Sequence, residues 1–92
     1  MRVMSWARHF QWMRRNVSDL SDAFAKVVEK HRTAKGFSKA RLAERAGLHQ
    51  TYIGLLERGQ RSPNLDTAKA IADALGVTFT KMIDESERLR KR

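Results

Sequence analysis

Two neighbouring polar residues near the middle of the chain have the chemistry needed to recognise DNA bases. Gln50 can pair with adenine through two hydrogen bonds, and Thr51 can donate or accept one. Leu55, one helical turn further on, can contact the methyl group of thymine. Lys39 lies at the expected first turn of the preceding helix, where a cation and free backbone N–H groups can bind a phosphate. This combination favours nucleic-acid recognition.

Charge and composition narrow the choice of partner. The chain has 92 residues, with 19 Lys and Arg against 10 Asp and Glu, a net charge of +9 and a pI near 10.9. Such a basic chain favours a polyanion, with nucleic acid first and an anionic membrane surface second. Hydrophobic residues at 41% fit one small globular domain. The absence of cysteine excludes disulfides and thiolate zinc sites, and no apolar run is long enough for a membrane span or a secretory segment.

Glycines and capping residues divide the chain into five short helices. The first is expected to begin at a Ser21 cap and to end at Lys35–Gly36. The second begins after Ser38 and ends at Gly47, and the third covers residues 49–58. The residues expected on the buried sides of the first two are Phe24, Val27, Val28, His31, Leu42, Ala43 and Ala46.

The last two helices follow the same signals. The fourth opens at Asn64 or Asp66 and ends at Gly76, with Leu65, Ala68, Ile71, Ala72 and Leu75 on its buried side. The fifth begins after Thr78 and contains Phe79, Met82 and Ile83. The acid-first pairs Asp84–Arg88 and Glu87–Lys91 indicate that this helix extends toward the C-terminus.

The second and third helices have the features of two helices that cross at a steep angle. Ala43 supplies the small side chain that a close crossing needs, and Gly47 supplies a positive φ between the helices. In the third helix, a step of about 100° per residue turns Tyr52, Ile53 and Leu56 inward, and Gln50, Thr51, Gly54, Leu55 and Arg58 outward or to the margins.

Gly54 and Leu55 each leave two interpretations open. A mid-helix glycine costs about 1 kcal/mol relative to alanine, which is explained either by close approach of DNA or by a neutral surface position. Leu55 contacts DNA in the predicted register, and would belong to the core if the helix were rotated.

Residues 24–83 resemble the phage repressor and Cro-like helix-turn-helix family, often called the XRE family. The matching residues are Leu42-Ala43, Ala46-Gly47-Leu48, Tyr52-Ile53, Leu56-Glu57-Arg58-Gly59, Arg61, Pro63 and Ala74-Leu75-Gly76-Val77. The resemblance covers about two-thirds of the chain and implies a five-helix DNA-binding domain, usually a homodimeric bacterial or phage transcription regulator. It also implies a structural ion pair between Arg32 and Glu57, and a phosphate-contacting segment at Gln60, Arg61, Ser62 and Asn64.

The predicted interface therefore has two groups of residues. Those predicted to read bases are Gln50, Thr51, Gly54 and Leu55. Those predicted to bind phosphates are Lys39, His49, Arg58, Gln60, Arg61 and Asn64. Three residues depart from the family pattern: Arg41 replaces a capping-box Glu or Gln, His49 replaces the Ser or Thr that caps the third helix, and Leu55 is apolar on the outward side.

The predicted architecture is all-α: a compact five-helix, repressor-like helix-turn-helix domain at 19–83, with a basic amphipathic leader at 1–18 and a charged tail at 84–92. In the leader, Trp6, Phe10, Met13 and Val17 have helical spacing, with arginines between them. This segment could be an extra helix packed on the core, a flexible leader, a DNA-contacting arm or a docking helix for a protein partner.

The sequence predicts a non-enzymatic, sequence-specific regulator that binds double-stranded DNA as a homodimer, needs no cofactor or metal, and works in the cytoplasm without a membrane partner. No catalytic motif occurs, and no effector-binding domain is expected. The predicted dimer forms through the fifth helix, at Phe79, Met82, Ile83 and Leu89. The alternative is a protein-interaction module, such as a toxin-neutralising partner or a coactivator-like adaptor, that docks through Trp6, Phe10 and Trp12.

Overall fold

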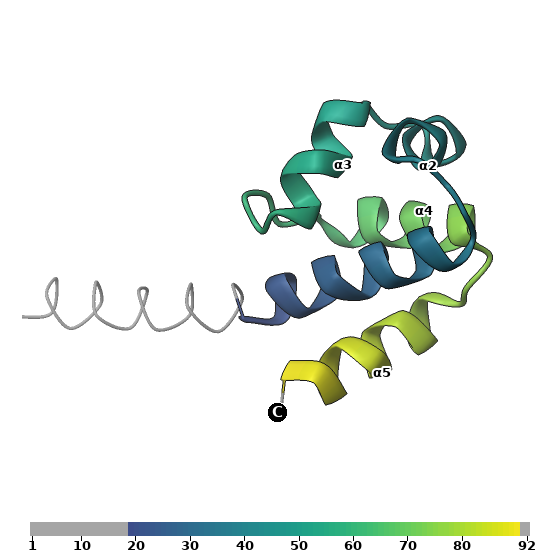
Figure 1. The fold of residues 1–92 in the computed structure, drawn as a ribbon. Coiled ribbons are helices and arrows are strands. Elements are labelled where there is room, and N and C mark those ends of the chain that lie inside the picture. Colours follow the sequence, from purple (N-terminus) through teal and green to yellow (C-terminus); the bar gives the residue numbers. More distant parts are fainter. Residues whose placement is uncertain (1–18, 91–92) are drawn as a thin grey trace, which may run out of the picture.

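A computed structural model describes residues 19–90, and every regular element in that range is an α-helix (Figure 1). The first helix is described over residues 19–34, and is followed by α2 (Lys39–Ala46), α3 (Gln50–Glu57), α4 (Leu65–Leu75) and α5 (Phe79–Arg90). The predicted all-α class and its five helices are confirmed. The leader at 1–18 and the Glu87–Lys91 pair lie outside the described residues.

Short polar side chains begin three of the helices as predicted. The Ser38 hydroxyl accepts a hydrogen bond from the Arg41 N–H at 3.0 Å, and the Asn64 side chain accepts one from Thr67 at 2.7 Å. Thr78 Oγ1 accepts one from the Lys81 N–H at 3.1 Å. These bonds satisfy backbone donors that have no partner inside the helix. The predicted cap at Ser21 is wrong, because residues 19 and 20 are already helical.

The core draws buried side chains from all five helices. Its fully buried members include Val28, Leu42, Ile53, Leu56, Ile71 and Met82. The sequence predicts Leu65 on the buried side of α4, but this residue is 75% exposed. Its spacing fits that face, yet it is the first residue of the helix, just after the Asn64 cap, and lies beyond the part that packs on the core.

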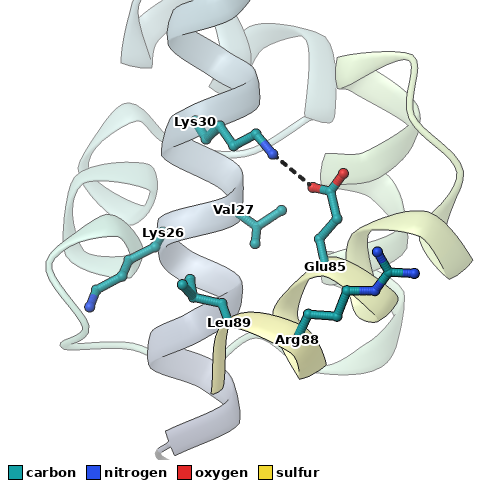
Figure 2. Close-up of a pocket in the computed structure, with 6 residues that line it drawn as sticks. All are labelled: Lys26, Val27, Lys30, Glu85, Arg88 and Leu89. Carbon is teal, nitrogen blue, oxygen red and sulfur yellow. Dashed lines mark ion pairs between the residues drawn. The ribbon is translucent and has the colours of Figure 1, made fainter. Parts of the chain in front are cut away.

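The first helix links the two sides of the domain. In Figure 1 it runs across the middle of the molecule, with α5 below it and α2 and α3 at the top. His31 Nε2 and Glu85 Oε1 are 2.8 Å apart, which joins this helix to α5, and Lys30 pairs with the same carboxylate at 3.5 Å. Between the two helices lies a shallow groove of about 340 Å³ (Figure 2), lined by Lys26, Val27, Lys30, Glu85, Arg88 and Leu89.

Helix α5 extends past residue 83, the predicted end of the domain. It runs without a break to Arg90, so the expected boundary between residues 83 and 84 falls inside the helix. The predicted Asp84–Arg88 ion pair forms at 3.0 Å, and Ser86 is fully buried, with its hydroxyl donating to the Met82 carbonyl at 2.7 Å. The beginning of the predicted tail is therefore part of the folded domain.

Candidate nucleic-acid interface

Helices α2 and α3 form a tight helix-turn-helix unit. Ala43, on α2, is buried with only 2% of its surface exposed. Gly47 ends that helix with φ at 72°. The Leu48 N–H donates to the Ala43 carbonyl at 2.8 Å, which closes the turn. Only glycine adopts this left-handed conformation without strain, so the predicted roles of Ala43 and Gly47 are confirmed.

The N-terminal end of α3 presents its polar residues to solvent. Gln50 and Thr51 are both exposed in the first turn. The first backbone bonds of the helix run from the N–H groups of Tyr52 and Ile53 to the His49 carbonyl, so the N–H groups of Gln50 and Thr51 point out of the helix end. Exposed His49 makes no side-chain capping bond within residues 19–90. The N-terminal end of α3 therefore carries two exposed polar side chains and backbone N–H groups that have no partner within the helix.

The outward face of α3 differs from the prediction at two residues. Leu55 is half-buried, so it is partly available at the surface. Gly54 is buried although it faces outward, because the Arg58 side chain covers it. The Arg58 terminal nitrogens lie 3.5 and 4.0 Å from the position that a Cβ of residue 54 would take. Sequence reasoning missed this contact, although the four-residue spacing could have suggested it.

The predicted phosphate-binding residues precede or follow α3 in the chain. Lys39 is the half-buried first residue of α2, and Gln60 and Arg61 are exposed in the loop after α3. Asn64 uses its side-chain oxygen to cap α4, which leaves its NH₂ group as the donor available to a phosphate. Burial raises the pKa of Tyr52, and the positive charge of Arg61 partly opposes this effect. The Arg61 charge is therefore close enough to α3 to act on it.

A buried ion pair holds the other end of α3. Arg32 Nε donates to Glu57 Oε2 at 2.7 Å, and its Nη2 donates to Oε1 at 3.0 Å. The side chains are only 11% and 3% exposed. The hydrogen bond to Glu57 raises the pKa of Arg32, although burial acts in the opposite direction. The predicted pair is confirmed, and it fixes α3 against the first helix.

The described surface contains neither a metal cluster nor a long apolar helix. Within residues 19–90, no group of three His, Cys, Asp or Glu side chains is arranged to hold a metal ion. In the same range, no helix has the length and apolar character needed to cross a membrane.

This geometry agrees with a known family. Residues 28–82 match the family model described as Helix-turn-helix. The chain belongs to the repressor-like helix-turn-helix family. Within that family, the chain is similar to the control protein C.SmaI from Serratia marcescens, at 37% identity over 71% of this chain and 77% of the relative.

Solved helix-turn-helix structures have the same fold. The restriction-modification controller protein C.AhdI from Aeromonas hydrophila is 35% identical, covers 67% of this chain and 94% of its own, and gives a TM-score of 0.65. The controller protein C.Esp1396I, solved as a tetramer with its natural 35-base-pair operator, is 25% identical. It covers 79% of this chain and 96% of its own, with a TM-score of 0.74. Members of this family are transcription regulators that bind DNA.

Proposed function

We propose that this protein is a non-catalytic regulator of transcription that binds specific duplex DNA sequences. Helix α3 enters the major groove, where Gln50, Thr51 and Leu55 contact base edges. No base contact is proposed for Gly54, because the Arg58 side chain covers it. Lys39, His49, Gln60, Arg61 and the free amide of Asn64 bind phosphates on both sides. A role on chromosomal or phage DNA corresponds to a cytoplasmic location in a bacterium.

The observation that carries this proposal is the exposed start of α3, held by a rigid support. Gln50 and Thr51 are exposed, whereas Ile53 and Leu56 on the same helix are fully buried. The helix is also held at its C-terminal end by the Arg32–Glu57 pair. A helix fixed in this way can present the same side chains to each DNA site, and precise presentation is needed for sequence recognition.

The proposed assembly is a homodimer that places two copies of α3 about 34 Å apart on a palindromic operator. One recognition helix reads only a few base pairs, so useful specificity needs two copies. The prediction that Met82 takes part in the dimer is wrong, because this side chain is 0% exposed in the core. Phe79 and Ile83 are also partly buried against the core, which leaves Leu89, 37% exposed, as the apolar contact on α5.

Binding-site selection from random duplex DNA tests this function directly. The expected result is an enriched sequence with two-fold symmetry and half-sites one helical turn apart. A protein that retains all random duplexes equally, at low and moderate salt, would be a general polyanion binder. That outcome would overturn the proposed function.

A further inference from the structure

Arg58 covers the centre of the outward face of α3. Its two terminal nitrogens lie 3.5 and 4.0 Å from the Cβ position of Gly54, and Gly54 is buried as a result. Arg58 itself is exposed. The guanidinium group therefore lies back along the helix surface and remains open to solvent on its other side.

Packing among residues 19–90 does not explain the glycine at position 54. Its φ is not positive, and a methyl group there would be at an ordinary contact distance of 3.5 Å from Arg58. Alanine would fit, and it is the stronger helix former. A glycine at this position leaves more space beside the guanidinium group than alanine would.

Helical geometry places this guanidinium group among the residues proposed to read bases. At about 100° per residue, Arg58 lies about 20° around the helix axis from Thr51 and about 40° from Gly54. Side chains on a helix lean toward its N-terminus, and the Arg58 guanidinium lies one turn back, at Gly54. It is therefore displaced from the C-terminal end of α3 toward Gln50 and Thr51.

The donors of this group are available to a ligand. None of the ion pairs within residues 19–90 involves Arg58. A guanidinium group is planar and presents several N–H donors in a fixed fork, which matches the O6 and N7 acceptors of guanine in the major groove. The same fork can also bind a phosphate, so the position of the group at Gly54, beside Thr51, is what favours a base edge.

We propose that Arg58 is a specificity-determining residue that pairs with a guanine in each half-site, rather than one of the phosphate contacts. This assignment rests on the DNA-binding function proposed above. It predicts that the preferred operator contains a G·C pair next to the positions read by Gln50 and Thr51.

Arg58→Lys separates the two roles, because it keeps the charge and removes the fork. Site selection with this variant should reduce the preference for guanine at one position per half-site by about tenfold. Binding to random duplex DNA and its salt dependence should remain close to those of the unmodified protein. Arg61→Lys is the matched control, since the same change at a proposed phosphate contact should leave all base preferences intact.

A modified operator provides a second measurement that needs no folded variant. Replacing the selected guanine by 7-deazaguanine removes the N7 acceptor, and should weaken binding of the unmodified protein several-fold. Loss of affinity at this base, together with loss of guanine preference in Arg58→Lys, supports the assignment. A protein that selects a sequence, but whose Arg58→Lys variant keeps the same guanine preference, overturns the assignment and leaves the proposed function standing. An unmodified protein without any sequence preference overturns both.

Discussion

Arg32 and Glu57 form a side-on ion pair that joins the first helix to the last residue of α3, with hydrogen bonds of 2.7 and 3.0 Å. A third bond, from Arg32 Nη1 to the Phe37 carbonyl at 2.8 Å, ties in the segment that leads to α2. Both helices of the proposed DNA-binding unit thus depend on one guanidinium group. The ion pair holds α3 at its C-terminal end, against the first helix, whereas Gln50 and Thr51 lie at its N-terminal end.

Glu57→Ala should lower the free energy of unfolding by about 3–5 kcal/mol, because it leaves the Arg32 charge buried without its partner. Urea unfolding followed by circular dichroism measures this loss. Glu44→Ala is the control, since the Arg41–Glu44 pair is exposed and its removal should cost less than about 1 kcal/mol. Equal stabilities of the two variants would show that the buried pair does not hold the fold.

The pair between His31 and Glu85 should make stability depend on pH on the acid side. The hydrogen bond with His31 lowers the pKa of Glu85 below its ordinary value of 4.5, and burial partly opposes this. Lys30 lies on the same carboxylate and acts in the same direction as His31. Because the folded-state pKa is depressed, the ionised carboxylate stabilises the fold above pH 4.5, and this contribution disappears as the pH falls through the folded-state value.

Glu85→Gln should therefore reduce stability near neutral pH and have less effect at about pH 3, where the carboxylate is increasingly protonated. Urea unfolding at both pH values measures the difference. Glu87→Gln serves as the control, because within residues 19–90 the one ion pair of Glu87 is the 3.6 Å contact with Arg90. If Glu85→Gln and the unmodified protein differ by the same free energy of unfolding at both pH values, the role of this pair is contradicted.

Variants at Gly47, in the turn between α2 and α3, should show whether a side chain there destabilises the fold through backbone strain or through crowding. Gly47 has φ at 72°, and within residues 19–90 nothing lies within 4 Å of the position that a Cβ would take. Gly47→Ala should lower stability by about 1–2 kcal/mol through the left-handed backbone alone. Gly47→Asn should cost less, because asparagine tolerates this conformation. Thermal melts in which both variants lose the same stability would indicate a different cause.

The dimer proposal predicts different behaviour for the two exposed leucines. Leu89→Asp should shift the free protein toward monomer, because it places a charge in the proposed α5 contact. Leu65→Asp is the matched control, since Leu65 is 75% exposed at the start of α4, away from that contact. Analytical ultracentrifugation gives the oligomeric state of each variant. Dimerisation that survives Leu89→Asp would place the interface on another surface.

Local signals are sufficient to predict most of the fold. Ser38, Asn64 and Thr78 cap their helices because a short polar side chain satisfies nearby backbone donors, and that rule acts within a few residues. Gly47 is predictable for the same reason, since few residues adopt a positive φ. The Arg32–Glu57 pair spans 25 residues, and only the family resemblance indicates it.

Two of the wrong predictions concern packing between distant parts of the chain, whereas the Ser21 cap is wrong because the first helix already includes residues 19 and 20. Leu65 has the spacing of a buried residue, but among residues 19–90 it is 75% exposed, because it lies at the very start of α4. The sequence predicts Met82 at a dimer contact, yet the core of the monomer buries this residue completely. The Arg58 side chain over Gly54 depends on a rotamer choice that spacing permits but does not require. Hydrophobic periodicity predicts which residues share one face of a helix, but it does not predict which part of the protein packs against that face.

The measurement that tests the central claim most directly compares Gln50→Ala with Lys39→Ala, using binding-site selection and the salt dependence of affinity. Gln50→Ala should cost about 1–3 kcal/mol on the best operator and relax the base preference at one position per half-site. Lys39→Ala should weaken binding to all duplexes alike and reduce the salt slope by about one for each phosphate that the variant no longer binds. Unchanged base preferences in Gln50→Ala, together with altered preferences in Lys39→Ala, would contradict the assignment of α3 as the recognition helix.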